Sequence, residues 1–294
     1  MENVKIAQVC GLCAGCRNAI DTTINELKNG RSVTIFKEIV HNKNVNSYLS
    51  SLGANYQEDI SKLSPTDLII VRAHGEPPET YEVFEKNGIQ YRDCTCKNVV
   101  RIHEIVSEYS ALGYKTIIIG KYKKTVHPEV YGTLGWAGED VVLIEEAEDL
   151  EKLKNVFGQK LNLVCQTTFN IEKAEKLIAQ IENIAQQNNC DLVVNKTLCM
   201  AQKVINKTSA ELAKQSDVMI VVGGKTSSNS LELFNNVKTI CPSVFIEDIY
   251  AYKDALKEAG VILNQSTRVG ITAGASTMKE ELVELKKMIE QEME

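Results

Sequence analysis

The stretch Val218-Met219-Ile220-Val221-Val222, which leads into Gly223-Gly224-Lys225-Thr226-Ser227-Ser228-Asn229-Ser230, indicates the fold class of this 294-residue chain. An interior strand of a parallel sheet is a continuous apolar run, because helices cover both faces of the sheet. Similar runs are Asp67 to Val71, Thr116 to Ile119 and Leu161 to Val164, and they alternate with helical patterns such as Glu79 to Lys86, Ile171 to Ile184 and Lys279 to Ile289. This alternation predicts an α/β fold with mostly parallel sheets.

The loops that follow the predicted strands contain most of the chemically unusual residues. In parallel α/β sheets, ligands bind at the carboxyl ends of the strands. A single histidine in such a loop is more often structural than catalytic, and a serine or asparagine before a helix is usually an N-cap. However, three of the four histidines lie in such loops. The loops are His41-Asn42, Ala73-His74-Gly75, His127-Pro128-Glu129, Cys165-Gln166-Thr167-Thr168 and Ala273-Gly274-Ala275-Ser276.

These loops together have the composition of an anion site. Imidazoles, hydroxyls and glycine-rich backbone suit a phosphorylated ligand, which they bind without a P-loop lysine. The Gly223-Gly224-Lys225-Thr226 segment resembles a P-loop only superficially, because it lacks the required order and spacing of glycine and lysine, and we exclude a nucleotide triphosphatase. The fourth histidine, His103, lies in a helical pattern, where we expect it on the surface or in packing.

Three cysteines, Cys13, Cys96 and Cys199, each lie between a strand-like run and a helical pattern. The three strand-like runs are Val4 to Val9, Ile89 to Asp93 and Asp191 to Lys196, and the helical patterns are Asn18 to Leu27, Val99 to Leu112 and Val204 to Leu212. A thiolate, or an anionic cluster held by thiolates, is stabilised by the positive end of a helix. The shared context predicts three ligands of one soft metal centre.

Other arrangements of the cysteines fit less well. Cys10, Cys13 and Cys16 open a ferredoxin-like cluster motif, but its continuation is missing. A zinc ribbon needs two close pairs of cysteines, and Cys94 and Cys96 are separated by a single residue. Three ligands would leave one iron of a four-iron cluster open to act as a Lewis acid on a substrate, whereas a fully ligated cluster only passes electrons.

The composition is that of a globular protein, with 44% hydrophobic and 24% charged residues. The net charge is −6 and the basic residues are scattered, which argues against a nucleic-acid partner. No apolar stretch near the starting Met suggests a signal peptide or membrane span, so we expect a cytoplasmic protein. Nine cysteines in a reducing compartment favour metal or redox chemistry over disulfides, although Cys190 and Cys241 are expected to be buried core residues.

A series of motifs in fixed order resembles the 4-hydroxy-3-methylbut-2-enyl diphosphate reductase family over nearly the entire chain. The motifs are Gly11-Leu12-Cys13-Ala14-Gly15, Glu38-Ile39-Val40-His41-Asn42, Ala73-His74-Gly75, Thr95-Cys96, His127-Pro128-Glu129-Val130 with Gly132-Thr133, Gln166-Thr167-Thr168, Ser227-Ser228-Asn229-Ser230 and Thr272-Ala273-Gly274-Ala275-Ser276. The resemblance implies the terminal iron–sulfur enzyme of the methylerythritol phosphate route to isoprenoids. It also implies a cloverleaf of three α/β domains around a central cluster, which we place at residues 1–96, 97–195 and 196–276, with a C-terminal helix at 277–294 packing on the first domain.

The resemblance also assigns roles to individual residues. Cys13, Cys96 and Cys199 match the ligands of a [4Fe-4S] cluster with one open iron. Glu129 matches the residue that directs protons to the leaving hydroxyl, Thr167 helps to position that group, and a ferredoxin or flavodoxin is the implied electron donor. The positions that match diphosphate binding are His41, His74, His127, Ser227, Asn229 and Ser276, with Ser228 close by; His127 and Thr167 lie nearest to the chemistry.

Several residues depart from the family pattern close to these positions. Cys16 replaces a hydrophobic residue, Cys165 replaces a common threonine, and the segment Asp93-Cys94-Thr95-Cys96-Lys97 stands where the family has Asp-Ala-Thr-Cys-Pro. The extra thiols are either small-residue replacements or groups that retune the cluster or substrate pocket. Two alternatives to the reductase therefore stay open: a paralogous iron–sulfur reductase or reductive dehydratase for another small anion, and a non-enzymatic redox sensor or electron carrier.

Overall fold

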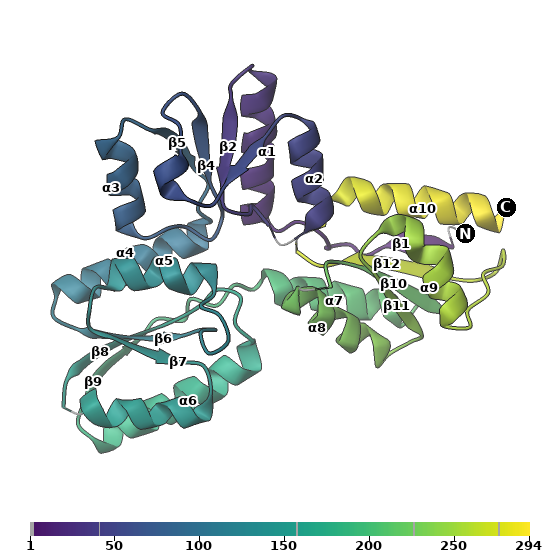
Figure 1. Cartoon of the computed structure of the whole chain (residues 1–294). Helices are drawn as coiled ribbons and strands as arrows, with labels where there is room; N and C mark the ends of the chain where they lie inside the picture. The colour runs from purple at the N-terminus through teal and green to yellow at the C-terminus, as the bar shows by residue number, and fades with distance from the viewer. Residues whose placement is uncertain (1–2, 41, 157, 226, 276) are drawn as a thin grey trace. The chain divides into compact units, whose positions relative to one another are not determined.

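The computed structural model describes residues 3–40, 42–156, 158–225, 227–275 and 277–294 (Figure 1). The chain divides into two compact units. The first unit is Met1–Tyr56 with Met200–Glu294, and the second unit is Gln57–Cys199. Among the described residues the strands form three four-stranded sheets, and every strand pair given below is parallel. The expected α/β fold with small parallel sheets is therefore confirmed.

The first unit contains a sheet with the strand order β1-β12-β10-β11. Its strands are β1 (Val4–Ile6), β12 (Val269–Ala273), β10 (Val218–Val222) and β11 (Ser243–Ile246). In β10, Val218, Ile220 and Val222 pack on one side with α9 (Tyr252–Glu258), α10 (Lys279–Met293) and the short helix η3 (Ile249–Ala251). Met219 and Val221 pack on the other side with α7 (Ala201–Ala213) and α8 (Ser228–Lys238). The continuous apolar run thus reflects burial on both faces.

The first strand of the chain, β1, belongs to a sheet whose other strands come from the last third of the sequence. Val4 pairs with Val269 and Ile6 pairs with Ile271, and α10 packs against both β1 and β12 (Figure 1). A parallel pair needs no local turn between its strands, so distant segments can form one. The expected domain bounds at 96, 195 and 276 stay a prediction. The pairing shows in addition that residues 4–6 belong to the same sheet as strands within residues 218–273.

The rest of the first unit consists of α1 (Ala14–Lys28), β2 (Val33–Phe36), α2 (Lys43–Ser51) and most of β3 (Asn55–Gln57). Helix α1 packs against β2 and α2. Helix α2 begins after Asn42, whose side chain accepts hydrogen bonds from the amides of Asn44 and Val45. This capped start lies next to the expected site residue His41, which is outside the described residues.

The second unit contains a sheet with the strand order β7-β6-β8-β9. Its strands are β6 (Lys115–Ile119), β7 (Val141–Ile144), β8 (Lys160–Cys165) and β9 (Asp191–Val194). Helices α4 (Lys97–Ala111) and α5 (Pro128–Ala137) cover one face, and α6 (Ile171–Gln187) and the short helix η2 (Ala147–Val156) cover the other. The unit also contains η1 (Ile60–Lys62), α3 (Pro78–Lys86) and the parallel pair β4 (Leu68–Val71) and β5 (Gln90–Asp93).

No helix in the described part of the chain is long and apolar enough to cross a membrane.

Candidate functional site

Each of the three cysteines singled out by the sequence lies at the start of a helix, as expected. Cys13 and Cys96 are the N-caps of α1 and α4, and Cys199 precedes Met200, the N-cap of α7. None of these helices has an acidic residue in its first turn. The N-terminal partial positive charges are therefore left to other anionic groups. Cys13 belongs to the first unit and the other two to the second. A preformed group of three metal-binding side chains is not found in the described part of either unit.

The loop that carries Cys13 is held by the loop after β12. The amides of Gly11, Leu12 and Cys13 donate to the carbonyl oxygens of Ala273, Thr277 and Ala275 at 3.2, 2.9 and 3.3 Å, respectively. Gly11 has a φ of +73°, and a Cβ there would lie 2.8 Å from the Thr277 oxygen, so the turn requires glycine. The motif around Cys13 and the motif after β12, which lie near opposite ends of the sequence, are therefore joined by backbone hydrogen bonds.

The sulfur of Cys13 lies among hydrogen-bond donors. The Cys16 thiol and the backbone amides of Cys16 and Gly15 lower the pKa of Cys13 to about 6, against the opposing effect of burial. A cysteine at a helix start with such donors is a thiolate near neutral pH, which is the form that ligates metals. This local chemistry fits a soft metal centre.

Cys96 and Cys199 are placed by backbone hydrogen bonds to strand ends. The Cys96 amide donates to the Ala73 oxygen at 2.9 Å, next to His74. The Cys199 amide donates to the Thr167 oxygen at 2.8 Å. The segments after β5 and β9 thus continue alongside the segments after β4 and β8, and each brings a cysteine to a loop with expected site residues.

Glu129 and Thr167 form a buried pair in the second unit. Glu129, in the first turn of α5, is 1% exposed. Its Oε1 accepts from the Thr167 amide at 2.5 Å, and its Oε2 accepts from the Thr167 hydroxyl at 2.7 Å. Burial raises the pKa of Glu129 to about 7, although both hydrogen bonds from Thr167 act to lower it. A carboxyl group with this pKa can hold and release a proton near neutral pH.

Two of the expected histidines meet beside this pair. The rings of His74 and His127 lie edge to face with their centres 5.4 Å apart. His127 is the N-cap of α5, and its Nδ1 accepts from the Glu129 amide at 3.3 Å. The same short segment therefore places one imidazole and the buried acid.

His103 packs against Gly75 in the His74 loop. It is buried, and its ring stacks on Trp136 with centres 5.4 Å apart and planes at 17°. Burial lowers the pKa of His103 to about 4, so the ring is neutral. A Cβ on Gly75, whose φ is +72°, would lie 2.7 Å from His103 Cε1. The packing alternative for this histidine is therefore confirmed.

In the first unit, a serine cluster forms at the ends of β10 and β12. Ser227 caps α8 by accepting from the Ser230 amide at 3.4 Å, and the Ser230 hydroxyl donates to the Ser227 hydroxyl at 3.0 Å. A Cβ on Gly223 or Gly274 would lie 2.5 or 2.1 Å from side-chain atoms of Ser230. Ser230, which the sequence did not single out, thus needs both glycines beside it. The partly exposed Asn229 lies in the same turn, whereas Ser276 and the Ser228 side chain are outside the described residues.

Comparison with known proteins identifies the family. The family model described as LytB protein matches residues 4–290. The chain belongs to the LytB family. A relative from Clostridioides difficile (strain 630), named 4-hydroxy-3-methylbut-2-enyl diphosphate reductase, is 34% identical over 276 residues, 94% of each chain. A relative of the same name from Helicobacter pylori (strain Shi470) is 33% identical over 275 residues, 93% of this chain and 94% of the relative.

Two solved structures resemble this LytB chain. One is a (E)-4-hydroxy-3-methyl-but-2-enyl diphosphate reductase described as the terminal enzyme of the non-mevalonate pathway, with a TM-score of 0.77 and 31% identity over 99% of this chain and 100% of that one. The other is the corresponding reductase from Plasmodium falciparum, with a TM-score of 0.80 and 25% identity over 99% of this chain and 87% of that one. The three parallel-sheet parts of the present fold are thus those of LytB enzymes.

The extra thiols of this LytB protein have different surroundings. Cys165 is fully buried in the core between β8 and α6, where burial raises its pKa to about 12. Cys94 is 2% exposed. Cys165 is thus a packing residue and Cys94 is buried, whereas Cys16 contacts the sulfur of Cys13. Cys190 and Cys241, expected to be buried, are half-buried at the edges of two cores.

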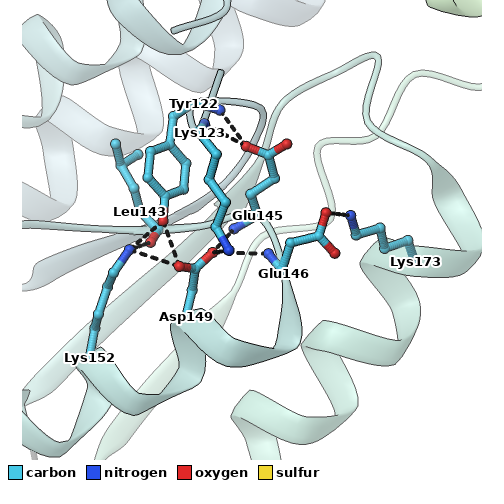
Figure 2. A network of polar contacts seen from close by, with 8 residues as sticks. All are labelled: Tyr122, Lys123, Leu143, Glu145, Glu146, Asp149, Lys152 and Lys173. Atoms are coloured by element: carbon cyan, nitrogen blue, oxygen red, sulfur yellow. Dashed lines mark hydrogen bonds and ion pairs between the residues drawn. The ribbon is translucent and has the colours of Figure 1, made fainter. Parts of the chain in front are cut away.

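A polar network that the sequence did not reveal fixes the loop before His127 (Figure 2). Glu145 Oε2 accepts from the amides of Tyr122 and Lys123 at 2.7 and 2.8 Å. Asp149 accepts from the Tyr122 hydroxyl at 2.7 Å and from Lys123 and Lys152 at 3.3 and 3.1 Å. The bonds from Tyr122 and the nearby backbone hold the pKa of Asp149 far below its usual range, against the effect of burial. Single acidic residues after an edge strand have no recognisable sequence pattern, which is why the network was missed.

Proposed function

We propose that this LytB protein reduces 4-hydroxy-3-methylbut-2-enyl diphosphate, removing its allylic hydroxyl to give isopentenyl and dimethylallyl diphosphate. The relatives of known name carry out this type of reaction, and the match to them covers nearly the whole chain. The structural observation that carries the proposal is the position of Thr167. Its amide and hydroxyl bind the buried acid Glu129, and its carbonyl binds the amide of Cys199, so one residue holds both the acid and a proposed cluster ligand.

The LytB family comprises iron–sulfur enzymes, and the residues present fit such a centre. Cys13, Cys96 and Cys199 provide the soft sulfur donors that iron–sulfur clusters require. The lowered pKa of Cys13 and the three helix starts without acidic residues favour an anionic group. A [4Fe-4S] cluster held by these three thiolates would supply single electrons and one iron open to act as a Lewis acid.

The protein residues supply the proton. Hydroxide is a poor leaving group, so the allylic hydroxyl must leave as water. Glu129, with a pKa of about 7, is protonated in a large fraction of molecules near neutral pH, because burial disfavours its charged form. When Glu129 is protonated on Oε2, this O–H can donate to the Thr167 hydroxyl oxygen, and the Thr167 O–H is then available to donate to the substrate hydroxyl. Glu129 and Thr167 thus deliver the proton together.

The remaining site residues bind the diphosphate. In the second unit, His74 and His127 offer imidazole donors, and in the first unit Ser227 and Asn229 offer a hydroxyl and an amide at the start of α8. His41, Ser228 and Ser276 complete the set on the basis of their sequence motifs. Donors at helix starts favour phosphate oxygens over neutral groups. A diphosphate matches this set better than a carboxylate would, because it offers more acceptor oxygens.

Two electrons must reach the site from outside. We infer that a ferredoxin or flavodoxin supplies them singly, since the cluster accepts single electrons. A reducing compartment such as the cytoplasm suits both this donor and the free thiols.

The test is anaerobic purification, cluster reconstitution and an assay with hydroxymethylbutenyl diphosphate and a chemical reductant. We expect turnover, and we expect Glu129→Gln to keep the cluster spectrum while turnover falls by about 10²–10⁴-fold, the usual contribution of a general acid. Absence of turnover from a fully loaded wild-type protein contradicts the assigned substrate and favours a related reductase for another anion. Unchanged turnover of Glu129→Gln contradicts the role of the acid.

A further inference from the structure

A side-chain amide lies on the sulfur of one proposed ligand. Asn98, in the first turn of α4, directs its Nδ2 at Cys199 Sγ at a distance of 3.3 Å. Both residues belong to the second unit. Asn98 follows Cys96 by two positions, so a single helix start provides one ligand and a polar contact to another. Nothing in the proposed reaction uses this amide.

The contact joins two segments that are fixed independently. Cys199 is held by the bond from its amide to the Thr167 oxygen, and Cys96 by the bond from its amide to the Ala73 oxygen. Helix α4 is anchored by Val99 and Ile102, which are 2% and 1% exposed. The position of Asn98 therefore follows from the packing of α4, and its exposed side chain reaches the sulfur without distorting either segment.

The chemistry of the two groups determines which atom of the amide faces the sulfur. A thiolate accepts hydrogen bonds and cannot donate them, so it attracts the nitrogen of the amide and repels its oxygen. Reduction of a cluster adds negative charge, part of which lies on the ligand sulfurs. A donor on such a sulfur stabilises the reduced form and raises the reduction potential.

We propose that Asn98 is a positioning residue of the iron–sulfur centre, which raises the reduction potential of the cluster by donating an N–H···S hydrogen bond to Cys199. This inference rests on the proposed function only through the assignment of Cys96 and Cys199 as ligands. Asn98 directly follows Lys97, which stands where the family pattern has proline. The centre of this chain is thereby tuned by residues of its own α4 start.

The experiment compares wild type, Asn98→Leu, Asn98→Asp and Asn98→Gln after anaerobic reconstitution. Iron content establishes loading, and a redox titration followed by electron paramagnetic resonance measures the midpoint potential. For Asn98→Leu we expect a roughly threefold lower ratio of reduced to oxidised cluster at the wild-type midpoint, a shift of about 28 mV for a one-electron couple. Asn98→Asp should shift the potential further in the same direction, because a carboxylate repels the sulfur. Asn98→Gln, which keeps an amide donor, should lie closer to wild type than Asn98→Leu does.

The control is Asn183→Leu, the same change on the exposed face of α6, where Asn183 Oδ1 accepts a hydrogen bond from Gln187 Nε2 at 3.3 Å. It should leave the potential unchanged. A loaded Asn98→Leu protein with the wild-type midpoint overturns the inference. If Asn98→Leu binds too little cluster to be measured, the midpoint potentials of Asn98→Asp and Asn98→Gln are compared instead. Equal midpoint potentials in these two variants also overturn the inference. A wild-type chain that binds no cluster overturns the ligand assignment itself, whereas a loaded chain without turnover contradicts only the proposed substrate.

Discussion

Glu129 shows how burial gives one residue its chemistry. An exposed glutamate is charged at neutral pH, but this one is buried in the first turn of α5, and its carboxylate accepts hydrogen bonds from the Thr167 amide and hydroxyl. Desolvation outweighs these bonds and the pKa rises to about 7. The folded protein therefore holds a proton that the unfolded chain would lose at a lower pH.

This proton makes stability depend on pH. The pKa of Glu129 rises from an ordinary 4.5 to about 7 on folding, so the folded state binds more protons between these values. Its contribution is fully favourable below pH 4.5 and is lost as the pH rises through 7, a change on the order of 3 kcal/mol. We expect Glu129→Gln to raise the melting temperature relative to wild type more at pH 8 than at pH 5, as measured by circular dichroism. Glu148→Gln, at an exposed position, is the control and should keep the wild-type difference. An equal gain at both pH values would mean that Glu129 is charged in the fold.

At the scale of elements, the loops at the strand ends are held in place by side-chain packing and by hydrogen bonds from neighbouring elements. The His74 loop turns at Gly75 against His103, and the His127 loop is tied to Glu145 through the amides of Tyr122 and Lys123. These supports come from α4 and from the segment after β7, which carry no proposed diphosphate ligand. Substitutions there should disturb binding through the loops.

Gly75→Ala should destabilise the protein and weaken substrate binding. The new Cβ would lie 2.7 Å from His103 Cε1 on a backbone with a φ of +72°. The strain should cost roughly 1–3 kcal/mol and displace His74. Gly88→Ala is a matched control, because its φ is +64° and nothing lies within 4 Å of the new Cβ. Urea unfolding and KM should separate the two variants; equal effects would show that backbone conformation alone, without the clash, accounts for the loss.

Glu145→Ala should raise KM more than it lowers kcat. It removes the acceptor of two backbone amides in the loop before His127, and each lost bond from such a site costs about 1–3 kcal/mol (Figure 2). Glu146→Ala is the control, since the Glu146 side chain pairs with Lys173 and accepts from neither loop amide. Steady-state kinetics of the two variants test this; a wild-type KM for Glu145→Ala would mean that the loop keeps its shape without this carboxylate.

At the scale of the whole molecule, the proposed ligands come from three distant parts of the sequence. Cys13→Ser, Cys96→Ser and Cys199→Ser should each lower the iron content after reconstitution to a similar extent, because a cluster with two thiolates is weakly held. Cys16→Ala should keep the wild-type iron content, even though Cys16 contacts Cys13. Loss of iron from the Cys16 variant would contradict the proposed ligand set and would indicate that Cys16 binds the cluster.

The sequence predicted interior strands better than edge strands, for a physical reason. Strands β10 and β8 are buried on both faces, so their residues form continuous apolar runs. Strands β7 and β11 lie at sheet edges, and alternate residues are only partly buried, so no such run marks them. The loop His41-Asn42 was expected to follow a strand directly, whereas β2 already ends at Phe36.

The candidate site was predicted in its motifs but not in its supports. Cysteines at helix starts and histidines at strand ends are visible in sequence, because their local context is short-range. The raised pKa of Glu129, the role of Ser230 and the network around Asp149 depend on contacts between distant segments. Such contacts leave no local pattern.

The pairing of β1 with β12 has a consequence for how the chain folds during synthesis. The second unit is one continuous segment, Gln57–Cys199, and can fold once that segment has left the ribosome. The first unit cannot complete its sheet until residue 273 has been made, because β12 lies between β1 and β10. Val4–Ile6, which is synthesised before the other strands of that sheet, must therefore stay unpaired until β12 has been translated, which exposes its backbone to the cell's chaperones for longer than any other strand of the sheet.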